Sequence, residues 1–231
     1  MQGAGSWEIG LKMSGLTPQS AAGAITESLR CAILTGALPA GTQLKQSEIA
    51  KRFRASVVPV REAFQRIIAE GLAVHEPNRG VKVTSMSIED VQEITEVRAL
   101  LEPYVLRLSA LHLDMNDFSK AESILIQAAT TNNLIERAQL HWNFHRTLYA
   151  RSARPRALGQ LGVLYTSIHR CLMPIWSQVG LEPSWISSHM EIVAALRRGE
   201  VELGCQLVVD QIFAASKRLC EAGKFSSKQG R

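Results

Sequence analysis

Apolar residues recur with two different periods in the first third of the chain. Helical spacing comes first: Ile25, Leu29 and Ile33 stand four residues apart, which predicts a helix that Gly36 can end. Strand-like segments then flank the turn PNRG at 77–80, which predicts a hairpin. Helices followed by a hairpin predict a winged helix-turn-helix. The predicted helices cover 17–35, 46–53 and 57–70, and the predicted strands cover 42–45, 72–75 and 81–84.

From Ser87 onward the apolar residues keep a helical period, and no strand pattern appears. The motif SIED at 87–90 fits a capping box that opens the first of these helices. Short connections between helices are typical of antiparallel bundles, so this part is predicted to be all-helical. The predicted helices cover about 87–111, 115–130, 133–151, 155–178, 183–198 and 200–221.

The two patterns together predict a mainly α-helical protein with two domains. The N-terminus is rich in glycine, and both chain ends are predicted to be flexible. The predicted parts are a flexible N-terminus (1–15), a winged helix-turn-helix domain (16–84), an all-helical domain (85–222) and a flexible tail (223–231).

Composition narrows the class of protein. The chain is 46% hydrophobic and 20% charged, which is typical of a globular protein and excludes a mostly disordered one. The four cysteines form no Cys-x-x-Cys pair, which argues against a zinc ribbon or a disulfide framework and fits a reducing compartment. The chain has neither the pattern of a signal peptide nor a run of 18 apolar residues. A cytoplasmic protein without a membrane span is therefore expected.

The net charge of +5 is distributed unevenly along the chain. Residues 1–84 hold ten Lys or Arg and six Asp or Glu, a net charge of +4, whereas the rest holds sixteen and fifteen, a net charge of +1. A basic excess on one small domain is expected of a protein that binds a polyanion such as DNA.

The stretch SEIAKRFRASVVPVREAFQRIIAEGL at 47–72 contains the two helices that would dock on DNA. Serines can cap both helices, and Pro59 fits the first turn of the second. Arg61 lies on the exposed face of that helix, where its guanidinium can pair with guanine or hold a phosphate. An ordinary solvated basic face is the alternative. The residues expected to contact DNA are Ser47, Lys51, Arg52, Arg54, Ser56, Val57, Arg61, Arg79 and Gly80.

Two histidines stand four residues apart in LHWNFHRTLY at 140–149. Both His141 and His145 fall within the apolar arc of a predicted helix, so their imidazoles should point inward. This spacing lets two histidines share one metal ion. The alternative is a pair of core histidines that are hydrogen-bonded to their neighbours.

Arg98 also lies within an apolar arc of a predicted helix. A buried guanidinium needs an anion. Glu102, four residues later, can supply one within the same helix. The alternative partner is the carboxylate of a bound effector, which the planar guanidinium can hold with two hydrogen bonds.

A series of motifs runs from residue 29 to residue 102. LRCAILTGALPAG is followed by G-x-x-L-x-x-x-x-I-A, S-x-x-P-V-R-E-A-F and E-G-L-x-x-x-x-P-N-R-G-V-x-V, and MSIEDVQEITEVRALLE follows at 86–102. The first four resemble the DNA-binding domain of the GntR family of bacterial transcription regulators. The last resembles the opening of the helical effector domain in the FadR-like (FCD) branch. The resemblance spans about residues 16–219.

The resemblance implies a regulator that binds DNA as a homodimer. Two-fold symmetry would match a pseudo-palindromic operator. A small organic acid bound in the helical domain would control DNA binding, and in this family the regulator is usually a repressor. One position departs from the family, in which Arg usually follows Ser56: this chain has Val57 there, which can contact a thymine methyl group. Arg61 matches the second arginine of the family.

Effector domains of the FCD branch often bind a divalent metal through one Asp and three His. In this chain His145 and His189 match two of the histidines, His141 stands in place of the Asp, and Gln211 in place of the last histidine. All four fall on inward faces of predicted helices. Neutral imidazoles favour Zn, Ni or Fe. A divalent transition metal is thus one expectation, and a metal-free polar pocket is the alternative.

The effector pocket is expected to include Arg98, with Tyr165 and Trp176 as walls, although aromatic residues at helical spacing are often plain core. A ligand-responsive DNA-binding regulator is the favoured function, and no catalytic residues are expected. One alternative is a DNA-binding protein whose helical domain takes no ligand. Another is a histidine-ligated metalloenzyme, which is disfavoured because no carboxylate base stands beside the histidines as in His-Glu-x-x-His.

Overall fold

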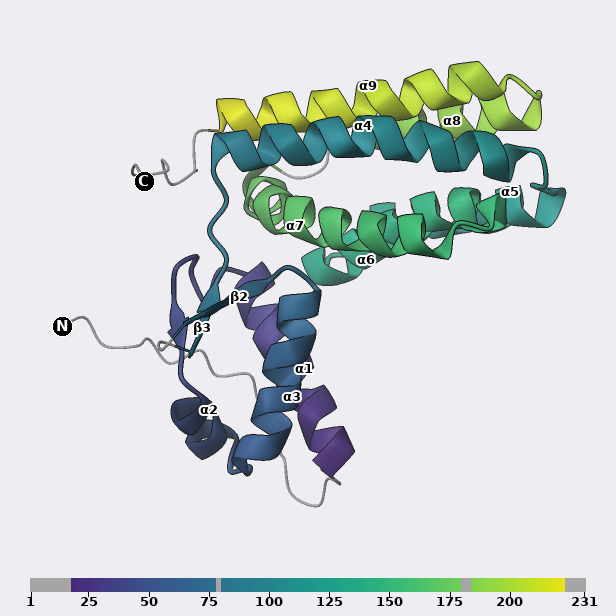
Figure 1. Ribbon diagram of the computed structural model, residues 1–231. Coiled ribbons are helices and arrows are strands. Elements are labelled where there is room, and N and C mark those ends of the chain that lie inside the picture. The colour runs from purple at the N-terminus through teal and green to yellow at the C-terminus, as the bar shows by residue number, and fades with distance from the viewer. Residues whose placement is uncertain (1–17, 78–79, 180–183, 223–231) are drawn as a thin grey trace. The chain divides into compact units, whose positions relative to one another are not determined.

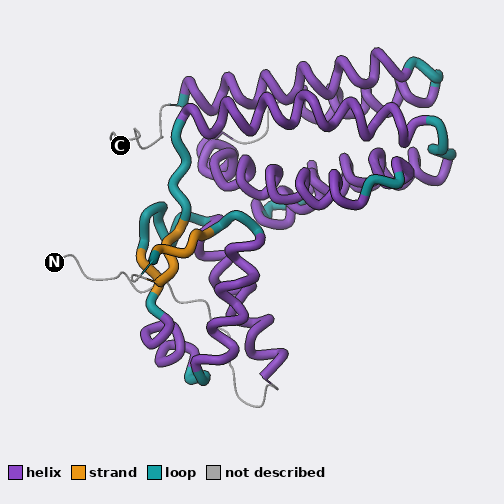
Figure 2. The backbone as a smooth tube through the Cα atoms, in the orientation of Figure 1, coloured by secondary structure: helices purple, strands orange, loops and turns teal. Residues whose placement is uncertain are grey.

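The computed structural model describes residues 18–77, 80–179 and 184–222 (Figures 1 and 2). Within these ranges the chain is mainly helical and carries one small antiparallel sheet, which confirms the predicted fold class. The chain forms two compact units, residues 1–85 and 86–231.

Several predictions lie outside the described residues. These are the flexible N-terminus (1–15), the flexible tail (223–231) and the DNA contact assigned to Arg79. Among the helices that the structure describes, none is long and apolar enough to cross a membrane.

The first unit, as far as it is described, packs three helices beside a three-stranded antiparallel sheet with strand order β1-β3-β2. Helix α3 contacts both α1 and α2. The buried side chains of Ile25 and Leu29 in α1 and of Phe64 and Ile67 in α3 belong to the core of this unit. The arrangement is a winged helix-turn-helix in which β2 and β3 form the wing (Figure 1). The elements are α1 (Pro18–Leu34), β1 (Gln43–Leu44), α2 (Gln46–Phe53), α3 (Val57–Ala69), β2 (Ala73–Glu76) and β3 (Gly80–Val83).

Both strands of the hairpin are displaced by one residue from the predicted ranges. The reason lies at the end of α3, where Gly71 adopts a φ of 72°. The backbone amide of Leu72 then donates to the carbonyl of Ile67, so Leu72 closes the helix and does not begin the strand. Across the hairpin Glu76 pairs with Gly80, which therefore belongs to β3.

The predicted serine caps are wrong in different ways. Helix α2 begins at Gln46 with Lys45 at the N-cap position, so Ser47 lies inside the helix. Ser56 does occupy the N-cap position of α3, but its hydroxyl makes no capping hydrogen bond. The turn between the two helices is instead made by Arg54, whose φ is 49° and whose amide donates to the carbonyls of Ala50 and Lys51.

The second unit, within the described ranges, contains only helices (Figure 1). Helix α4 lies along α9, α5 packs against α6, and α8 packs against α9. Ser87 and Asp90 form the predicted capping box at the start of α4. The helix predicted over 133–151 is shorter and ends in a 3-10 turn at Ala150–Ser152. The helices are α4 (Ile88–Ala110), α5 (Met115–Thr130), α6 (Leu134–Tyr149), α7 (Pro155–Val179), α8 (Ser184–Arg197) and α9 (Val201–Glu221).

The core of the second unit is mainly apolar, but it also contains a buried ion pair and three buried histidines. Leu106, Leu125 and Phe144 are fully buried, as expected of a helical bundle. Glu102 is also fully buried, and Arg98 is 6% exposed. Buried ionic groups persist only when they are paired or when they bind something, so this part of the core is the candidate ligand site.

Candidate functional site

The exposed face of α3 combines basic and apolar side chains. Arg61 and Gln65 are exposed on this helix. Val57 and Val58 in its first turn are 49% and 54% exposed, although valine is usually buried. An exposed apolar pair beside an arginine is the composition that reads thymine methyl groups and guanine in the major groove.

As far as the structure describes them, the other residues predicted to contact DNA lie in α2, in the turn before α3 and at the start of β3. These residues are all exposed, so each is accessible to a duplex. Lys51 and Arg52 lie at the end of α2, Arg54 lies in the turn before α3, and Gly80 lies at the start of β3. The remaining exposed candidates are Ser47 and Ser56.

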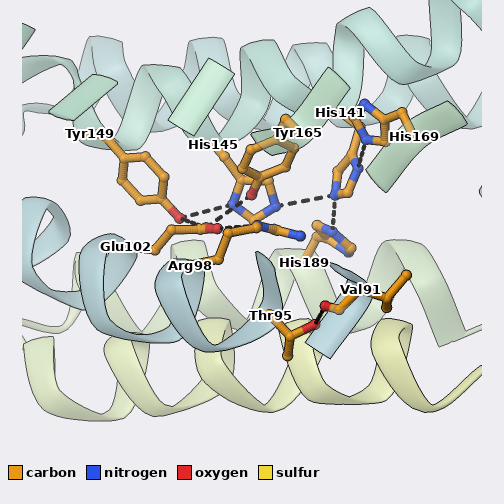
Figure 3. A network of polar contacts seen from close by, with 10 residues as sticks. All are labelled: Val91, Thr95, Arg98, Glu102, His141, His145, Tyr149, Tyr165, His169 and His189. Carbon is orange, nitrogen blue, oxygen red and sulfur yellow. Dashed lines mark hydrogen bonds and ion pairs between the residues drawn. The ribbon is translucent and has the colours of Figure 1, made fainter. Parts of the chain in front are cut away.

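Four histidines from three helices meet in the second unit (Figure 3). His141 and His145 come from α6, His169 from α7 and His189 from α8. The Nε2 atom of His141 lies 3.1 Å from Nε2 of His145 and 3.0 Å from Nε2 of His189. The other ring nitrogen of His141, Nδ1, lies 2.9 Å from Nε2 of His169. The prediction that His141, His145 and His189 share one interior is therefore met by their positions.

All four imidazoles are neutral at pH 7. Burial is the main cause, because it disfavours the charged form and lowers each pKa. The pKa of His169 is lowered to about 3 and that of His189 to about 4. Each ring therefore carries one proton, and the position of that proton decides what the ring can bind.

The neighbours of His145 and His189 fix where their protons are. Nδ1 of His189 lies 2.6 Å from the carbonyl oxygen of Trp185, which can only accept, so Nδ1 carries the proton. Nδ1 of His145 lies 3.2 Å from the hydroxyl of Tyr149, which already donates its own proton to Glu102. His145 therefore also donates from Nδ1. On both rings Nε2 is left with a lone pair.

These two lone pairs point at the same nitrogen, Nε2 of His141. A neutral His141 has one proton, so it can satisfy at most one of them. The cluster thus holds more acceptors than donors, as expected of a site that binds a cation. Bonds of about 2.0–2.1 Å to a transition metal would place neighbouring ligand atoms about 3.0–3.4 Å apart, close to the observed nitrogen separations.

Gln211 supplies a second sign of an incomplete site. Its side-chain nitrogen and oxygen are both buried and have no hydrogen-bond partner among the described residues. Unpartnered buried polar atoms are rare in folded proteins and call for a ligand or water. Gln211 lines the same cavity as His141, His145 and His189. The residues present therefore fit a metal ion with mainly nitrogen ligands.

Glu102 accepts hydrogen bonds from three polar side chains next to the histidines (Figure 3). Its Oε1 accepts from Nε of Arg98 at 2.7 Å, and its Oε2 accepts from the hydroxyls of Tyr149 at 2.7 Å and Tyr165 at 2.9 Å. The salt bridge predicted within α4 is thus present. Burial and then Glu102 raise the pKa of both tyrosines, which stay protonated and keep donating. Glu102 acts on His145 through Tyr149, as carboxylates behind metal-bound histidines commonly do.

A cavity of about 310 Å³ opens onto this polar cluster. Arg98, Tyr165 and Trp176, which were predicted to line an effector pocket, all lie in its wall. The guanidinium carbon of Arg98 lies 4.1 Å from the ring centre of Tyr165. The salt bridge to Glu102 does not remove Arg98 from the cavity, so its two predicted partners, an internal carboxylate and a ligand, are compatible.

Two features of the site went unpredicted. His169 lies four residues after Tyr165 in α7, and this spacing was the available signal for an inward histidine. The role of Tyr149 as a link between His145 and Glu102 depends on contacts between α4 and α6, which no local pattern reveals.

Comparisons with known proteins agree with this architecture. The profile of bacterial regulatory proteins of the gntR family matches residues 21–83, and the profile of the FCD domain matches residues 93–212. The "Probable D-xylose utilization operon transcriptional repressor" of Paenarthrobacter nicotinovorans is 27% identical, over 86% of this chain and 88% of that protein. The HTH-type transcriptional repressor RspR of Escherichia coli is also 27% identical, over 68% of this chain and 71% of its own length.

Solved structures of such regulators share the fold. A GntR transcriptional regulator from Rhodococcus sp. RHA1 is 23% identical and superposes with a TM-score of 0.71, over 89% of this chain and 100% of that chain. McbR/YncC of Escherichia coli is 21% identical with the same TM-score of 0.71, over 87% of this chain and 98% of that chain. The matched family and the named relatives are transcription regulators, which supports the regulator and not the metalloenzyme alternative. The chain belongs to the GntR family of bacterial transcription regulators and carries an FCD domain.

Proposed function

We propose that the protein is a ligand-responsive repressor in which a small carboxylate, bound in the cavity of the second unit, controls binding to operator DNA. The observation that carries this proposal is the convergence of unsatisfied histidine nitrogens, Arg98 and Gln211 on one cavity. Two relatives named as repressors support the direction of control.

On the DNA side, α3 enters the major groove. Arg61 reads guanine or holds a phosphate, and Val57 contacts a thymine methyl group. The basic side chains at the end of α2 hold phosphates and set the position of the helix. Because Val57 stands where the family usually has an arginine, the preferred operator contains thymine at the base pair that this residue faces.

The active form is a homodimer that pairs through α4. Apolar side chains recur along one face of this helix with spacings of three, four and seven residues, as in the seam of a coiled coil. Exposed apolar stripes mark interaction surfaces. They are Val97, Leu100 and Tyr104 in α4 and Leu111 directly after it, with exposed fractions of 41%, 77%, 45% and 75%. A two-fold homodimer would match a pseudo-palindromic operator.

On the ligand side, a divalent transition metal such as Zn, Ni or Fe is held by His141, His145 and His189, with Gln211 at the edge of the site. When bound, the ion supplies a positive charge that attracts a carboxylate. Arg98 adds a fixed charge, and its salt bridge to Glu102 keeps the guanidinium in place. The acid changes DNA binding by favouring one of two dimer geometries, since a ligand shifts an equilibrium only through different affinities for the two states.

Metal content tests the proposed site directly. Untagged protein purified without chelator is expected to contain about one transition-metal ion per chain. His145→Ala and His189→Ala should each lose most of it, while circular dichroism shows an intact helical fold. His112→Ala is the matched control, because His112 is exposed and outside the cluster. No metal in the parent protein would contradict the proposed metal site. Equal metal in all variants would place the metal elsewhere, and in either case the histidines would line a metal-free polar pocket.

A further inference from the structure

The cavity of the second unit is lined by both polar and apolar side chains. The polar lining residues include the histidines, Arg98, Gln211 and Arg218, with Ser184, Ser188 and Asp210. The walls are formed mainly by aliphatic side chains of α7 and α9, together with Trp176 and Trp185. The aliphatic residues include Ile168, Leu172, Ile175, Leu207, Ile212 and Ala215.

We infer that the effector is an apolar monocarboxylic acid, with a hydrocarbon or aromatic body, and not a hydroxylated acid such as a sugar acid. This inference rests on the proposed function, in which the cavity takes a carboxylate. It adds the chemical class of the rest of the ligand, which the metal and Arg98 do not determine.

The first argument is that, apart from that of the exposed Ser184, the hydroxyl groups near the cavity already donate within the protein. The hydroxyls of Tyr149 and Tyr165 both donate to Glu102. The hydroxyl of Ser188 donates to the carbonyl of Trp185. Asp210, which also lines the cavity, is exposed and already accepts a hydrogen bond from Gln206. The walls therefore offer few free partners for the hydroxyls of a ligand.

The second argument concerns the position of the indole rings. The ring of Trp185 lies 4.4 Å from that of His189, and the ring of Trp176 lies 5.7 Å from that of His169. Two indoles thus stand directly beside the imidazoles. A ligand whose carboxylate reaches the histidines must place its next carbon atoms against these rings, where apolar and aromatic groups pack well.

The third argument is electrostatic. Arg98 and Arg218 both line the cavity, and Asp210 is the acidic side chain that the same lining includes. Arg98 keeps its place in the lining although it is paired with Glu102, so the two guanidinium groups favour an anionic head group. The site therefore combines cationic groups for a carboxylate with apolar walls for the body of a fatty or aryl-alkanoic acid.

The expected selectivity follows from the cost of burying hydroxyls. Each ligand hydroxyl buried without a partner lowers affinity by about tenfold or more. Hexanoate and gluconate have the same carbon chain and charge and differ by the hydroxyls of gluconate. Hexanoate should therefore bind at least about 100-fold more tightly, even if most gluconate hydroxyls find water.

Calorimetric titration of the full-length protein tests this inference with four probes: hexanoate, 3-phenylpropanoate, gluconate and hexanamide. The two apolar acids should bind at least about 100-fold more tightly than gluconate, and hexanoate about tenfold more tightly than the neutral amide. Ala215→Phe should abolish binding of both acids, because the larger side chain fills part of the cavity, while metal content stays unchanged. Ala129→Phe is the matched control, at a half-buried helical position outside the cavity.

The outcomes separate this inference from the proposed function. If gluconate bound as tightly as hexanoate, or more tightly, the inference of an apolar acid would be overturned, but the proposal of a carboxylate effector would be unaffected. Hexanamide binding as tightly as hexanoate, or no binding of any acid, would overturn both. Unchanged binding in Ala215→Phe would place the acid outside this cavity and overturn the inference.

Discussion

Replacing Glu102 with Gln should destabilise the helical domain strongly, although the two side chains have nearly the same shape. The carboxylate is fully buried and accepts three hydrogen bonds, from Arg98, Tyr149 and Tyr165. Gln removes the negative charge and replaces one acceptor oxygen with a donor group. The guanidinium of Arg98 would then be buried without an anion.

The magnitude follows from that uncompensated charge. Removing one partner of a buried ion pair typically costs about 3–5 kcal/mol, which is the expected loss for Glu102→Gln. Removing both charges costs less, because no ion is left unpaired. Arg98→Met should therefore partly rescue Glu102→Gln, and the two substitutions should show a coupling of at least about 2 kcal/mol.

Urea unfolding followed by tryptophan fluorescence measures this free energy. Trp142, Trp176 and Trp185 all lie in the second unit, so they report on the domain that carries the ion pair. Glu122→Gln is a matched control, since its salt bridge to Arg197 is partly exposed and worth about 0–1 kcal/mol. The described hydrogen-bond network of Glu102 would be contradicted if Glu102→Gln lowered the free energy of unfolding no more than Glu122→Gln does. It would also be contradicted if the loss in the double variant equalled the sum of the losses in the single variants.

Four further results are expected. The pKa of His169 is lowered to about 3 and that of His189 to about 4, from about 6.5 in an unfolded chain, so the unfolded state takes up protons first as the pH falls. The stability of metal-free protein should thus fall by about 1.4 kcal/mol per pH unit for each histidine below pH 6.5; equal urea midpoints at pH 7 and pH 5 would contradict this. Arg61→Ala should weaken binding to a selected operator by about 1–3 kcal/mol and relax base preference in fluorescence anisotropy, and normal binding would exclude the contact. Replacing thymine with uracil at the base pair faced by Val57 should cost about 0.8 kcal/mol with the parent protein and nothing with Val57→Ala; an equal effect on both would assign the methyl contact elsewhere. Leu100→Glu should shift the protein toward monomer in sedimentation, and an unchanged dimer would move the interface off α4.

Hydrophobic periodicity was sufficient to predict the helices, because the apolar stripe of each helix faces the core of its own unit. The ends of α5 and α7 match the predicted ranges within one residue. The hairpin strands were displaced because the amide of Leu72 completes the end of α3, a backbone contact that side-chain pattern does not encode. The cap assigned to Ser47 failed because α2 begins at Gln46, where its predicted range begins, so the N-cap position belongs to Lys45.

The inward direction of His141, His145 and His189 could be read from helical spacing, but their mutual distances could not. Those distances depend on how α6 and α8 pack, which single-helix periodicity leaves open. His169 was not predicted for the same reason, because only the packing of α7 against α6 shows that its ring contacts Nδ1 of His141.

The coupling between the cavity and DNA binding is the central claim, and one anisotropy experiment tests it. A duplex selected by the protein is titrated with and without saturating hexanoate, at a fixed salt concentration. The account predicts that the acid weakens operator binding by about 5–150-fold in the parent protein, and that His189→Ala binds operator normally but no longer responds. Operator affinity that is unaffected by every acid that binds, or a response that survives in His189→Ala, would contradict it.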